Sequence, residues 1–375
     1  MKVKESVHSI SQTIKVCLEN NLCFAAYRLP EQAEQNLIVQ KDSEIKYINN
    51  LSNITELKGF LVAPFLQTDK NPMFLIQPDF YFEGEISEQA FSDLEKLENP
   101  KHHLDRKNLE QEITKEEYLQ QAEAFINAIK ENIIEKAVLS RTKIIDGQFE
   151  KKLPLLFTKL CESFPNAFVY LFKAEGHFWM GATPEPFASL KDNTFQTSSV
   201  AGTKENTEKY LQLENWGEKE RKEQQYVSDH ISRILKSEKW TNVSSFGPYV
   251  KKAGNMFHLR TDFTANVAEV NGNVGYLLTK LHPTPAVCGY QTEAAIKIID
   301  SVEKHDRQYY SGFLGPVGME NAISLFVNLR CMRISKSFLS LYTGSGITID
   351  SVPADEWQET EMKTETLLSA IRNIS

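Results

Sequence analysis

Long strand-like segments that follow one another along the chain constrain its fold more than any other feature. They are rich in aromatic and β-branched residues, and they occur in the first hundred residues and again in the second half. The segments are CFAAYRL, NLIVQ, GFLVAPFL, MFLIQPDFYFEGEI, KAVLSRTKIID, AFVYLFKA, FHLRTDFTANVAEV, NAISLFVNLRCMRI and FLSLYTGSGITI. Strands in tandem favour antiparallel sheets, so the sequence predicts an α+β fold rather than an alternating βαβ array.

Helices are expected between several of these strands. The segment TKEEYLQQAEAFINAIKENII begins with Thr114 and carries Glu117 three residues later, the pattern of a helix capping box. Further helices are expected around residues 153–163, 206–236, 289–303 and 355–372. The polar stretch 97–112 is the best candidate for a linker. Because no repeat of about 20 to 50 residues is present, the chain is expected to form one compact unit.

Composition excludes several classes of protein. The apolar fraction of 41% is ample for a core, and the net charge of -8 comes without a basic block, which argues against a nucleic-acid partner. No apolar run approaches the roughly 18 residues of a membrane span, and the N-terminus lacks the apolar core of a signal peptide, so a cytoplasmic protein is expected. A GxxxxGKS/T loop and a GxGxxG turn between strand and helix are both missing, so nucleotide chemistry has no support.

Two pairs of glutamates have helical spacing. Glu356, Glu359 and Lys363 in PADEWQETEMK stand at i, i+3 and i+7, which places them on one helical face. Glu220 and Glu223 in GEKERKEQQYVSDHI repeat the i, i+3 spacing. Carboxylate oxygens suit a hard cation such as Mg²⁺, whereas dense alternating charge is typical of a solvated helix face. Metal binding therefore requires that the two pairs meet across a pocket.

Lys136 is a candidate general base. In the predicted strand KAVLSR, alternation places Lys136 on the same face as Val138 and Ser140 and opposite Arg141. One of the two cations must then face inward or lie at a sheet edge. A buried lysine can accept a proton near neutral pH, whereas an edge lysine would only reach water.

Glu185 is a candidate general acid. It lies between two prolines in WMGATPEPF, just after a predicted strand, so its backbone has little freedom. Against an apolar wall such a carboxyl would stay protonated and could donate a proton. The alternative is an ordinary turn glutamate.

Three further polar residues stand among apolar neighbours. His258 in MFHLRTDF and His282 in KLHPTPAV are most simply core histidines that form hydrogen bonds, and they have no metal-ligand spacing. Arg330, inside the predicted strand FVNLRCM, is expected to need an anionic partner. That partner could be a structural carboxylate or a substrate.

Together these segments resemble the chorismate-utilising enzymes, the family of isochorismate, salicylate, anthranilate and aminodeoxychorismate synthases. The resemblance rests on ten segments in the family's order, from about Thr114 to Arg372. They are KAVLSR, GATPEP, SVAGT, KERKE, FHL, LHPTPAVCG, DRQYYSGFLG, NLRC, YTGSGI and SVPADEWQETEMK. The resemblance implies a single domain over residues 1–375, with 1–105 as the variable N-terminal part and 106–375 as the catalytic core. It also implies two stacked antiparallel sheets with helices outside and the site in the cleft between them.

The resemblance assigns a role to each matching residue. Lys136 corresponds to the lysine that activates water, and Glu185 to the acid that protonates the departing hydroxyl. The implied magnesium ligands are Glu223 and Glu359, supported by Glu220 and Glu356. Residues implied around the substrate are Tyr310, Arg330, Gly344 and Lys363 at the enolpyruvyl group, Gly202, Thr203 and His258 at the ring, and also Ala286 and Val287.

The segment LHPTPAVCG matches isochorismate synthases, whereas ammonia-using relatives tend to have threonine at the position of Ala286. The implied reaction is the Mg²⁺-dependent, reversible conversion of chorismate to isochorismate, in which water attacks C2 and the C4 hydroxyl leaves. Its product would feed menaquinone or catechol siderophore biosynthesis. The resemblance further implies a monomer that needs no glutaminase subunit.

Three alternatives stay open. A salicylate synthase would go on to eliminate pyruvate from isochorismate, and an aminating synthase would use ammonia from a glutaminase. A non-catalytic binding protein would keep the fold alone, although the intact acidic and basic candidates argue against it. Gln224, Cys288 and Ser311 replace residues that are common in the family, which leaves pyruvate loss undecided.

Overall fold

The structure, a computed structural model, describes residues 7–100, 112–240, 242–253, 256–269 and 272–374. Its strands form two nine-stranded sheets and one two-stranded sheet, and all pairings among the described strands are antiparallel. The predicted linker over residues 97–112 falls mainly on residues 101–111, outside the described part.

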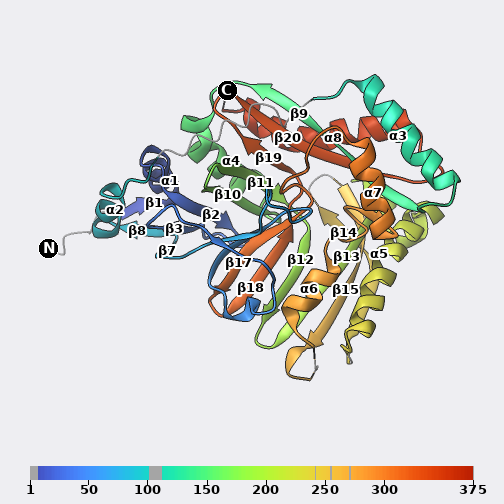
Figure 1. Cartoon of the computed structure of the whole chain (residues 1–375), viewed down its shortest axis with the longest axis horizontal. Coiled ribbons are helices and arrows are strands. Elements are labelled where there is room, and N and C mark those ends of the chain that lie inside the picture. Colours follow the sequence, from blue (N-terminus) through green and yellow to red (C-terminus); the bar gives the residue numbers. More distant parts are fainter. Residues whose placement is uncertain (1–6, 101–111, 241, 254–255, 270–271, 375) are drawn as a thin grey trace.

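Strands from distant parts of the sequence alternate across each sheet (Figure 1). In spatial order the first sheet contains β16 (Gly289–Tyr290), β9 (Lys136–Asp146), β20 (Phe338–Ile347), β19 (Cys331–Ile334), β11 (His177–Thr183), β10 (Phe168–Ala174), β2 (Cys23–Arg28), β3 (Asn36–Gln40) and β7 (Phe80–Glu83). The second sheet contains β14 (Ser244–Ala253), β15 (Met256–Asn266), β13 (Thr194–Glu205), β12 (Pro186–Lys191), β18 (Ala322–Val327), β17 (Phe313–Met319), β5 (Gly59–Ala63), β6 (Phe74–Ile76) and β4 (Lys46–Tyr47). The small sheet pairs β1 (Val7–Ser9) with β8 (Glu85–Ser87). The first hundred residues thus contribute strands to both large sheets.

Eight α-helices lie in the described part of the chain. They are α1 (Ile10–Glu19), α2 (Glu88–Glu95), α3 (Lys115–Lys130), α4 (Leu153–Ser163), α5 (Glu218–Ser237), α6 (Val274–Leu281), α7 (Thr292–Val302) and α8 (Pro353–Arg372). The predicted capping box begins α3, because Thr114 Oγ1 accepts from the Glu117 amide and Glu117 Oε2 accepts from the Thr114 amide.

Two helix predictions were wrong in detail. The helix expected over residues 206–236 begins only at Glu218, because short 3₁₀ turns and extended residues occupy the segment before it. The segment expected to be helical over 289–303 starts as strand β16. Helices α2 and α6 were not predicted from the sequence. None of the described helices is both long enough and apolar enough to span a bilayer.

Apolar side chains from both large sheets meet in a core between them, which includes Phe60, Phe74, Phe168, Trp179 and Phe326. Burial of each such aromatic ring stabilises the fold by about 1.5–3 kcal/mol. The outer face of the first sheet packs against α1, α4 and the last turns of α8, and that of the second sheet packs against α5 and α6. The predicted α+β fold of two stacked antiparallel sheets with helices outside is therefore confirmed.

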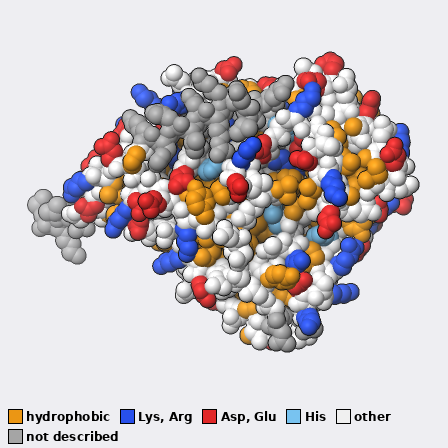
Figure 2. Space-filling model, viewed as in Figure 1, with side chains coloured by type: hydrophobic (Ala, Val, Ile, Leu, Met, Phe, Trp, Pro, Cys, Tyr) orange, Lys and Arg blue, Asp and Glu red, His pale blue; other side chains and the backbone are white. Residues whose placement is uncertain are grey.

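Charged side chains of both signs are intermingled on the face that Figure 2 shows. Hydrophobic and histidine side chains appear near the middle of that face, where the surface is hollowed. Over the coloured residues of this face no continuous basic stripe follows the surface. This distribution matches the sequence, which contains no block of basic residues.

Candidate active site

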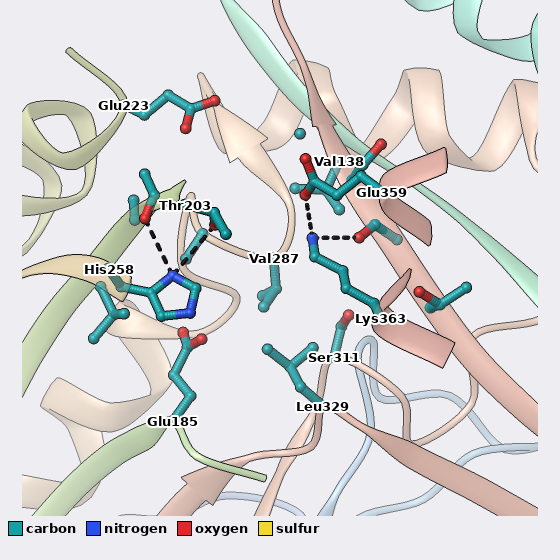
Figure 3. A pocket seen from close by; sticks show the side chains of 18 of the residues that line it. Val138, Glu185, Thr203, Glu223, His258, Val287, Ser311, Leu329, Glu359 and Lys363 are labelled. Atoms are coloured by element: carbon teal, nitrogen blue, oxygen red, sulfur yellow. Dashed lines mark hydrogen bonds and ion pairs between the residues drawn. The ribbon is translucent and has the colours of Figure 1, made fainter. Parts of the chain in front are cut away.

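A pocket lies between the two large sheets, lined by β9 and β20 of the first, β13 and β15 of the second, and by α5 and α8 (Figure 3). All fifteen residues that the sequence analysis selected belong to its lining. They are Lys136, Glu185, Gly202, Thr203, Glu220, Glu223, His258, Ala286, Val287, Tyr310, Arg330, Gly344, Glu356, Glu359 and Lys363. Residues up to 227 positions apart in the sequence, from Lys136 to Lys363, thus share one cavity.

Lys136 is the first residue of β9, and only 4% of its surface is exposed. Its side chain enters the pocket beside Gly346 of β20. A Cβ atom at position 346 would lie 3.0 Å from Lys136 Cε and 3.6 Å from both Lys136 Nζ and Glu223 Oε1. Glycine therefore leaves room for the amine and the carboxylate in the same part of the pocket. The alternative of an edge lysine that reaches water is wrong.

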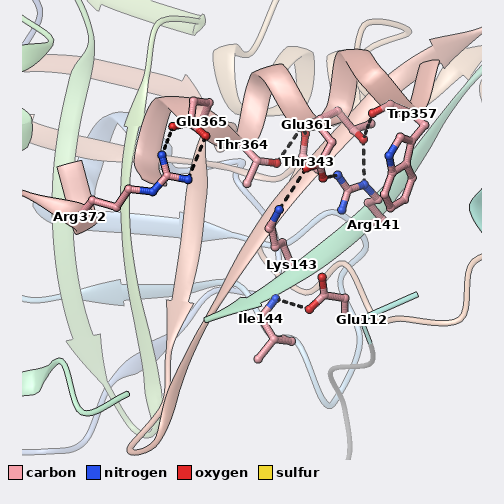
Figure 4. A network of polar contacts seen from close by, with 11 residues as sticks. Glu112, Arg141, Lys143, Ile144, Thr343, Trp357, Glu361, Thr364, Glu365 and Arg372 are labelled. Carbon is pink, nitrogen blue, oxygen red and sulfur yellow. Dashed lines mark hydrogen bonds and ion pairs between the residues drawn. The ribbon is translucent and has the colours of Figure 1, made fainter. Parts of the chain in front are cut away.

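Arg141 is also buried, but it packs under α8 (Figure 4). Its Nε donates to Thr360 Oγ1 at 2.8 Å, and its Cζ lies 4.0 Å from the centre of the Trp357 ring. The guanidinium also forms an ion pair with Glu361, which Lys143 contacts at 3.1 Å. These contacts hold α8 against the strand that carries the pocket lysine.

Glu185 occupies the turn between β11 and β12, where two hydrogen bonds fix its backbone. Its amide donates to Thr183 Oγ1 at 3.3 Å, and its carbonyl accepts from the Val327 amide at 3.0 Å. Burial of the carboxyl raises the pKa of Glu185 to about 7, although four nearby cations oppose the shift. A large fraction of this carboxyl is therefore protonated near neutral pH and able to donate a proton.

His258 lies beside Glu185, whose carboxyl points toward the imidazole ring in Figure 3. The Nδ1 atom of His258 is 3.1 Å from the Gly202 carbonyl oxygen and 3.2 Å from Thr203 Oγ1. Burial lowers the pKa of His258 to about 4, so the ring is neutral. A carbonyl only accepts hydrogen bonds, so Nδ1 carries the proton in its bond to Gly202 and Nε2 is left as an acceptor. His258 thus forms the hydrogen bonds expected of a core histidine, but its ring also lines the pocket.

His282 is a structural histidine, as the sequence predicted. Its Nε2 lies 3.0 Å from the Pro64 carbonyl oxygen and 3.1 Å from that of Phe65. Burial lowers the pKa of His282 to about 4, which keeps the ring neutral. Its ring is absent from the pocket lining.

The four glutamates face the pocket from two helices. Glu356 and Glu359 come from α8, and Glu220 and Glu223 come from the first turns of α5. Three of them have described partners: Ser351 Oγ donates to Glu356 at 2.7 Å, Lys363 pairs with Glu359 at 2.5 Å and Lys204 pairs with Glu220 at 2.6 Å. Among the described residues, no hydrogen bond or ion pair engages the carboxylate of Glu223. The interpretation of these residues as a plain solvated face was therefore wrong.

The pKa shifts of the α8 pair run in opposite directions. Burial raises the pKa of Glu356, and the neighbouring Glu359 carboxylate adds to the shift. Burial also opposes ionisation of Glu359, but the ion pair and hydrogen bond with Lys363 outweigh it and lower its pKa. Ionisation is thus favoured at Glu359 and opposed at Glu356.

The donor set of the four glutamates, the acidic wall of the pocket, fits a hard cation, since it consists of carboxylate oxygens that face an open cavity. The side chains are not gathered into a finished cage: within the described residues, no three His, Cys, Asp or Glu groups converge on one point. The ammonium groups of Lys204 and Lys363 neutralise part of the negative charge of Glu220 and Glu359. A cation that keeps several water ligands would suit this arrangement.

Arg330 lies between β18 and β19, not within a strand, and has a φ of +48°. The chain turns there from the second sheet to the first, which the continuous apolar pattern of FVNLRCM did not indicate. Its Nη1 donates to the Lys363 carbonyl at 2.9 Å and lies 3.4 Å from Thr366 Oγ1. Among the described residues, no carboxylate forms a hydrogen bond or ion pair with Arg330. The backbone of α8 holds the side chain, and Arg330 lines the pocket.

Several lining residues were not predicted from the sequence, and Lys219 is the most informative of them. Lys219 Nζ is 3.8 Å from Glu356 Oε1, so it brings a cation from α5 to the acidic wall. Its spacing of four residues from Glu223 could have indicated a shared helical face. The other missed residues are Val138, Pro184, Val200, Ala201, Ser311, Leu329, Tyr342, Thr343, Ser345 and Gly346.

A sequence profile of chorismate binding enzymes matches residues 71–372, most of the chain. The chain belongs to the chorismate binding enzyme family. Among curated relatives, it is 29% identical over 265 residues to the vibriobactin-specific isochorismate synthase of Vibrio cholerae, covering 68% of this chain and 66% of the relative. It is 29% identical over 269 residues to the isochorismate synthase MenF of Bacillus subtilis, covering 70% of this chain and 56% of the relative. The chain thus spans less than two thirds of the length of these relatives.

Solved structures in the family share the fold. A putative 2,3-dihydroxybenzoate-specific isochorismate synthase from Bacillus anthracis has a TM-score of 0.75 at 22% identity, covering 96% of this chain and 99% of that one. The menaquinone-specific isochorismate synthase MenF from Escherichia coli has a TM-score of 0.76 at 19% identity, covering 98% and 95%. At these identities the likeness shows that this family member has the same architecture.

Proposed function

We propose that this chain is an isochorismate synthase, which converts chorismate reversibly to isochorismate. The observation that carries the proposal is the pairing of a buried lysine with a carboxyl whose pKa is about 7 in one pocket. Reversible hydroxyl transfer needs one group that accepts a proton and another that donates one. The curated relatives named above, which act as isochorismate synthases, support the same reaction.

The proton transfers follow from these two groups. Lys136 accepts a proton from water as the water oxygen bonds to C2 of chorismate. The ring double bond shifts, the bond between C4 and its hydroxyl breaks, and Glu185 donates a proton so that water departs. The reverse reaction exchanges the two roles. Neutral His258 beside Glu185 adds no positive charge that would favour ionisation of the acid.

The substrate carboxylates would meet the cationic side of the pocket. Arg330 and Lys363 bring positive charge into the lining, and the Lys363 ammonium donates to the Gly344 carbonyl at 2.8 Å. A Cβ atom at Gly344 would lie 2.9 Å from the hydroxyl oxygen of Tyr310, so glycine allows that hydroxyl to reach the same region. These groups suit a small dianion with one carboxylate on its enolpyruvyl group.

We further propose that Glu223 and Glu359 hold Mg²⁺, with Glu220 and Glu356 in support. When bound, the ion would neutralise a substrate carboxylate and stabilise charge that develops on it. Ala286 and Val287 form an apolar part of the lining, which suits water rather than ammonia as nucleophile, so no glutaminase is required.

Product analysis tests this proposal. Purified protein should convert chorismate to isochorismate in the presence of Mg²⁺ and approach the same mixture from isochorismate, as followed by chromatography. Salicylate as the main final product, with isochorismate only transient, would identify a salicylate synthase instead. Turnover that depends on ammonium would identify an aminating synthase, and binding of chorismate without any product would identify a binding protein.

A further inference from the structure

The edge of the first sheet next to Lys136 is unusual, because its outermost strand is only two residues long. β16 pairs Tyr290 with Lys136 and Gly289 with Ala137. The chain then leaves the sheet at Gln291, which has a φ of +64°, and continues as α7. Beyond Val138, whose amide donates to the Cys288 carbonyl, no described strand continues β16 along this edge of β9.

Two buried side chains take the place of that missing strand. Glu303, which directly follows α7, accepts from the Ser140 amide at 2.7 Å and from Ser140 Oγ at 2.9 Å. Arg307 Nη2 donates to the Val138 carbonyl at 2.6 Å. The Ser140 amide and the Val138 carbonyl are thus satisfied by a carboxylate and a guanidinium rather than by another strand.

Glu303 and Arg307 also form an ion pair in which Nε donates to Oε2 at 2.8 Å and Nη2 to Oε1 at 2.5 Å. The side chains of Glu303 and Arg307 are 2% and 3% exposed. Burial opposes ionisation of each group, but their mutual attraction outweighs it, so the pKa of Glu303 is lowered and that of Arg307 is raised. Both groups are therefore charged near neutral pH.

Arg307 donates one more hydrogen bond, which connects two walls of the pocket. Its Nη1 donates to the Val287 carbonyl at 2.9 Å. Val287 and Val138 both line the pocket, and Figure 3 shows both side chains there. A single rigid guanidinium therefore sets the distance between the strand of Lys136 and the loop that carries Ala286 and Val287.

We infer that Glu303 and Arg307 are positioning residues, which fix the lysine strand relative to the Ala286–Val287 loop and so place the attacking water. The inference rests on the proposed function, since that water is the nucleophile of the proposed reaction. Neither residue is itself part of the pocket lining. A lysine at position 307 would keep the positive charge. It lacks the planar guanidinium that donates to Glu303, Val138 and Val287 at the same time.

The experiment compares Arg307→Lys with Arg28→Lys. Arg28 is a matched control, because it too is buried and donates to backbone carbonyls. Its partners are the carbonyls of Leu29 at 3.0 Å, Pro165 at 2.6 Å and Phe164 at 2.5 Å, and it lies on β2 outside the pocket lining. We expect Arg307→Lys to lower kcat about tenfold or more with a much smaller change in KM, and Arg28→Lys to leave both within about twofold of wild type.

A second pair of variants tests the carboxylate and covers the case in which Arg307→Lys does not fold. Glu303→Gln retains an oxygen that can accept from the Ser140 amide, whereas Glu303→Leu retains none. We expect Glu303→Gln to keep more of the wild-type kcat than Glu303→Leu. Equal losses of kcat in these two variants, or equal losses in Arg307→Lys and Arg28→Lys, would overturn the inference.

Hydrogen exchange gives a readout that needs no turnover. The backbone amides in a peptide over residues 136–141 should exchange faster in Arg307→Lys and Glu303→Leu than in wild type and Arg28→Lys. Unchanged exchange at these residues would overturn the positioning inference. A wild-type protein that makes no isochorismate would instead overturn the proposed function, so the two failures are distinguishable.

Discussion

Lys136 and Arg141 are both buried, although their positions on β9 place them on opposite faces of the first sheet. Lys136 enters the pocket, and Arg141 anchors α8. Since α8 also carries Glu356 and Glu359, the strand connects the proposed base to half of the acidic wall. A change at either residue should therefore affect the same reaction by different routes.

Replacement of Lys136 by methionine should remove the proposed base. We expect kcat to fall by about 10²–10⁴, because general base catalysis contributes about that much. The matched control is Lys143→Met on the same strand, whose half-exposed ion pair with Glu361 lies outside the pocket lining. Isochorismate formation at saturating chorismate measures the effect. A Lys136→Met variant with the wild-type rate would contradict the assigned role.

The pH dependence of activity should reflect Glu185. Its carboxyl has a pKa of about 7, so the protonated donor is depleted as the pH rises through that value. We expect the rate of hydroxyl loss to decline on the alkaline side of about pH 7 and Glu185→Gln to lose most turnover. A rate profile that stays flat from pH 6 to pH 9 would argue against Glu185 as the acid.

The same shift predicts an effect on stability. A carboxyl whose pKa is raised from 4.5 to about 7 holds its proton more tightly in the folded state, so the protein loses stability as the pH rises between these values. Glu185→Gln removes this loss and should raise the free energy of unfolding by up to about 3 kcal/mol at pH 8, with little change at pH 4. Urea unfolding at the two pH values measures it.

Removal of the Glu359 carboxylate should weaken metal binding. We expect Glu359→Gln to raise the Mg²⁺ concentration for half-maximal activity about tenfold or more. Glu365→Gln on the same helix is the control, since Glu365 is exposed and pairs with Arg372. Calorimetric titration with Mg²⁺ in the absence of chorismate provides a second readout. If both variants titrate like wild type, Glu359 is not a ligand.

Arg141→Met should loosen α8. The substitution removes the hydrogen bond to Thr360 and leaves Glu361 with Lys143 alone, so we expect a loss of about 2–4 kcal/mol in unfolding free energy. Lys143→Met should cost no more than about 1 kcal/mol. The Mg²⁺ requirement should rise in Arg141→Met and not in Lys143→Met. Equal effects of the two variants on stability and on Mg²⁺ would exclude a specific anchor.

Local patterns predicted much of the fold. The capping box of Thr114 and Glu117 begins α3, and the helical spacing of Glu356 and Glu359 places both in the pocket. The ordered set of family segments predicted which distant residues meet. Spacing alone could not do so, because pocket formation depends on the pairing of strands that lie far apart in the chain.

The positions that sequence reasoning missed depend on tertiary contacts. Arg330 looked like a strand residue, since the turn from one sheet to the other leaves the apolar pattern unbroken. Glu303 and Arg307 carry no periodic signal, because they act in place of a strand that the chain does not form. Lys219 lies in a run of charged residues that is typical of an exposed helix. The packing of α5 determines which side of that helix faces the cavity.

The pairing of β5 with β17 and of β2 with β10 has a consequence for how the polypeptide is made. At about 5–20 residues per second, the ribosome needs roughly 10 to 50 s after it has produced β5 before the partner strand exists. In the first part of that interval, before β10 is made, Phe60 and Phe74 also lack the rings of Phe168 and Phe172 against which they pack. Cellular yield of this protein should therefore depend on holdase chaperones that shield nascent chains.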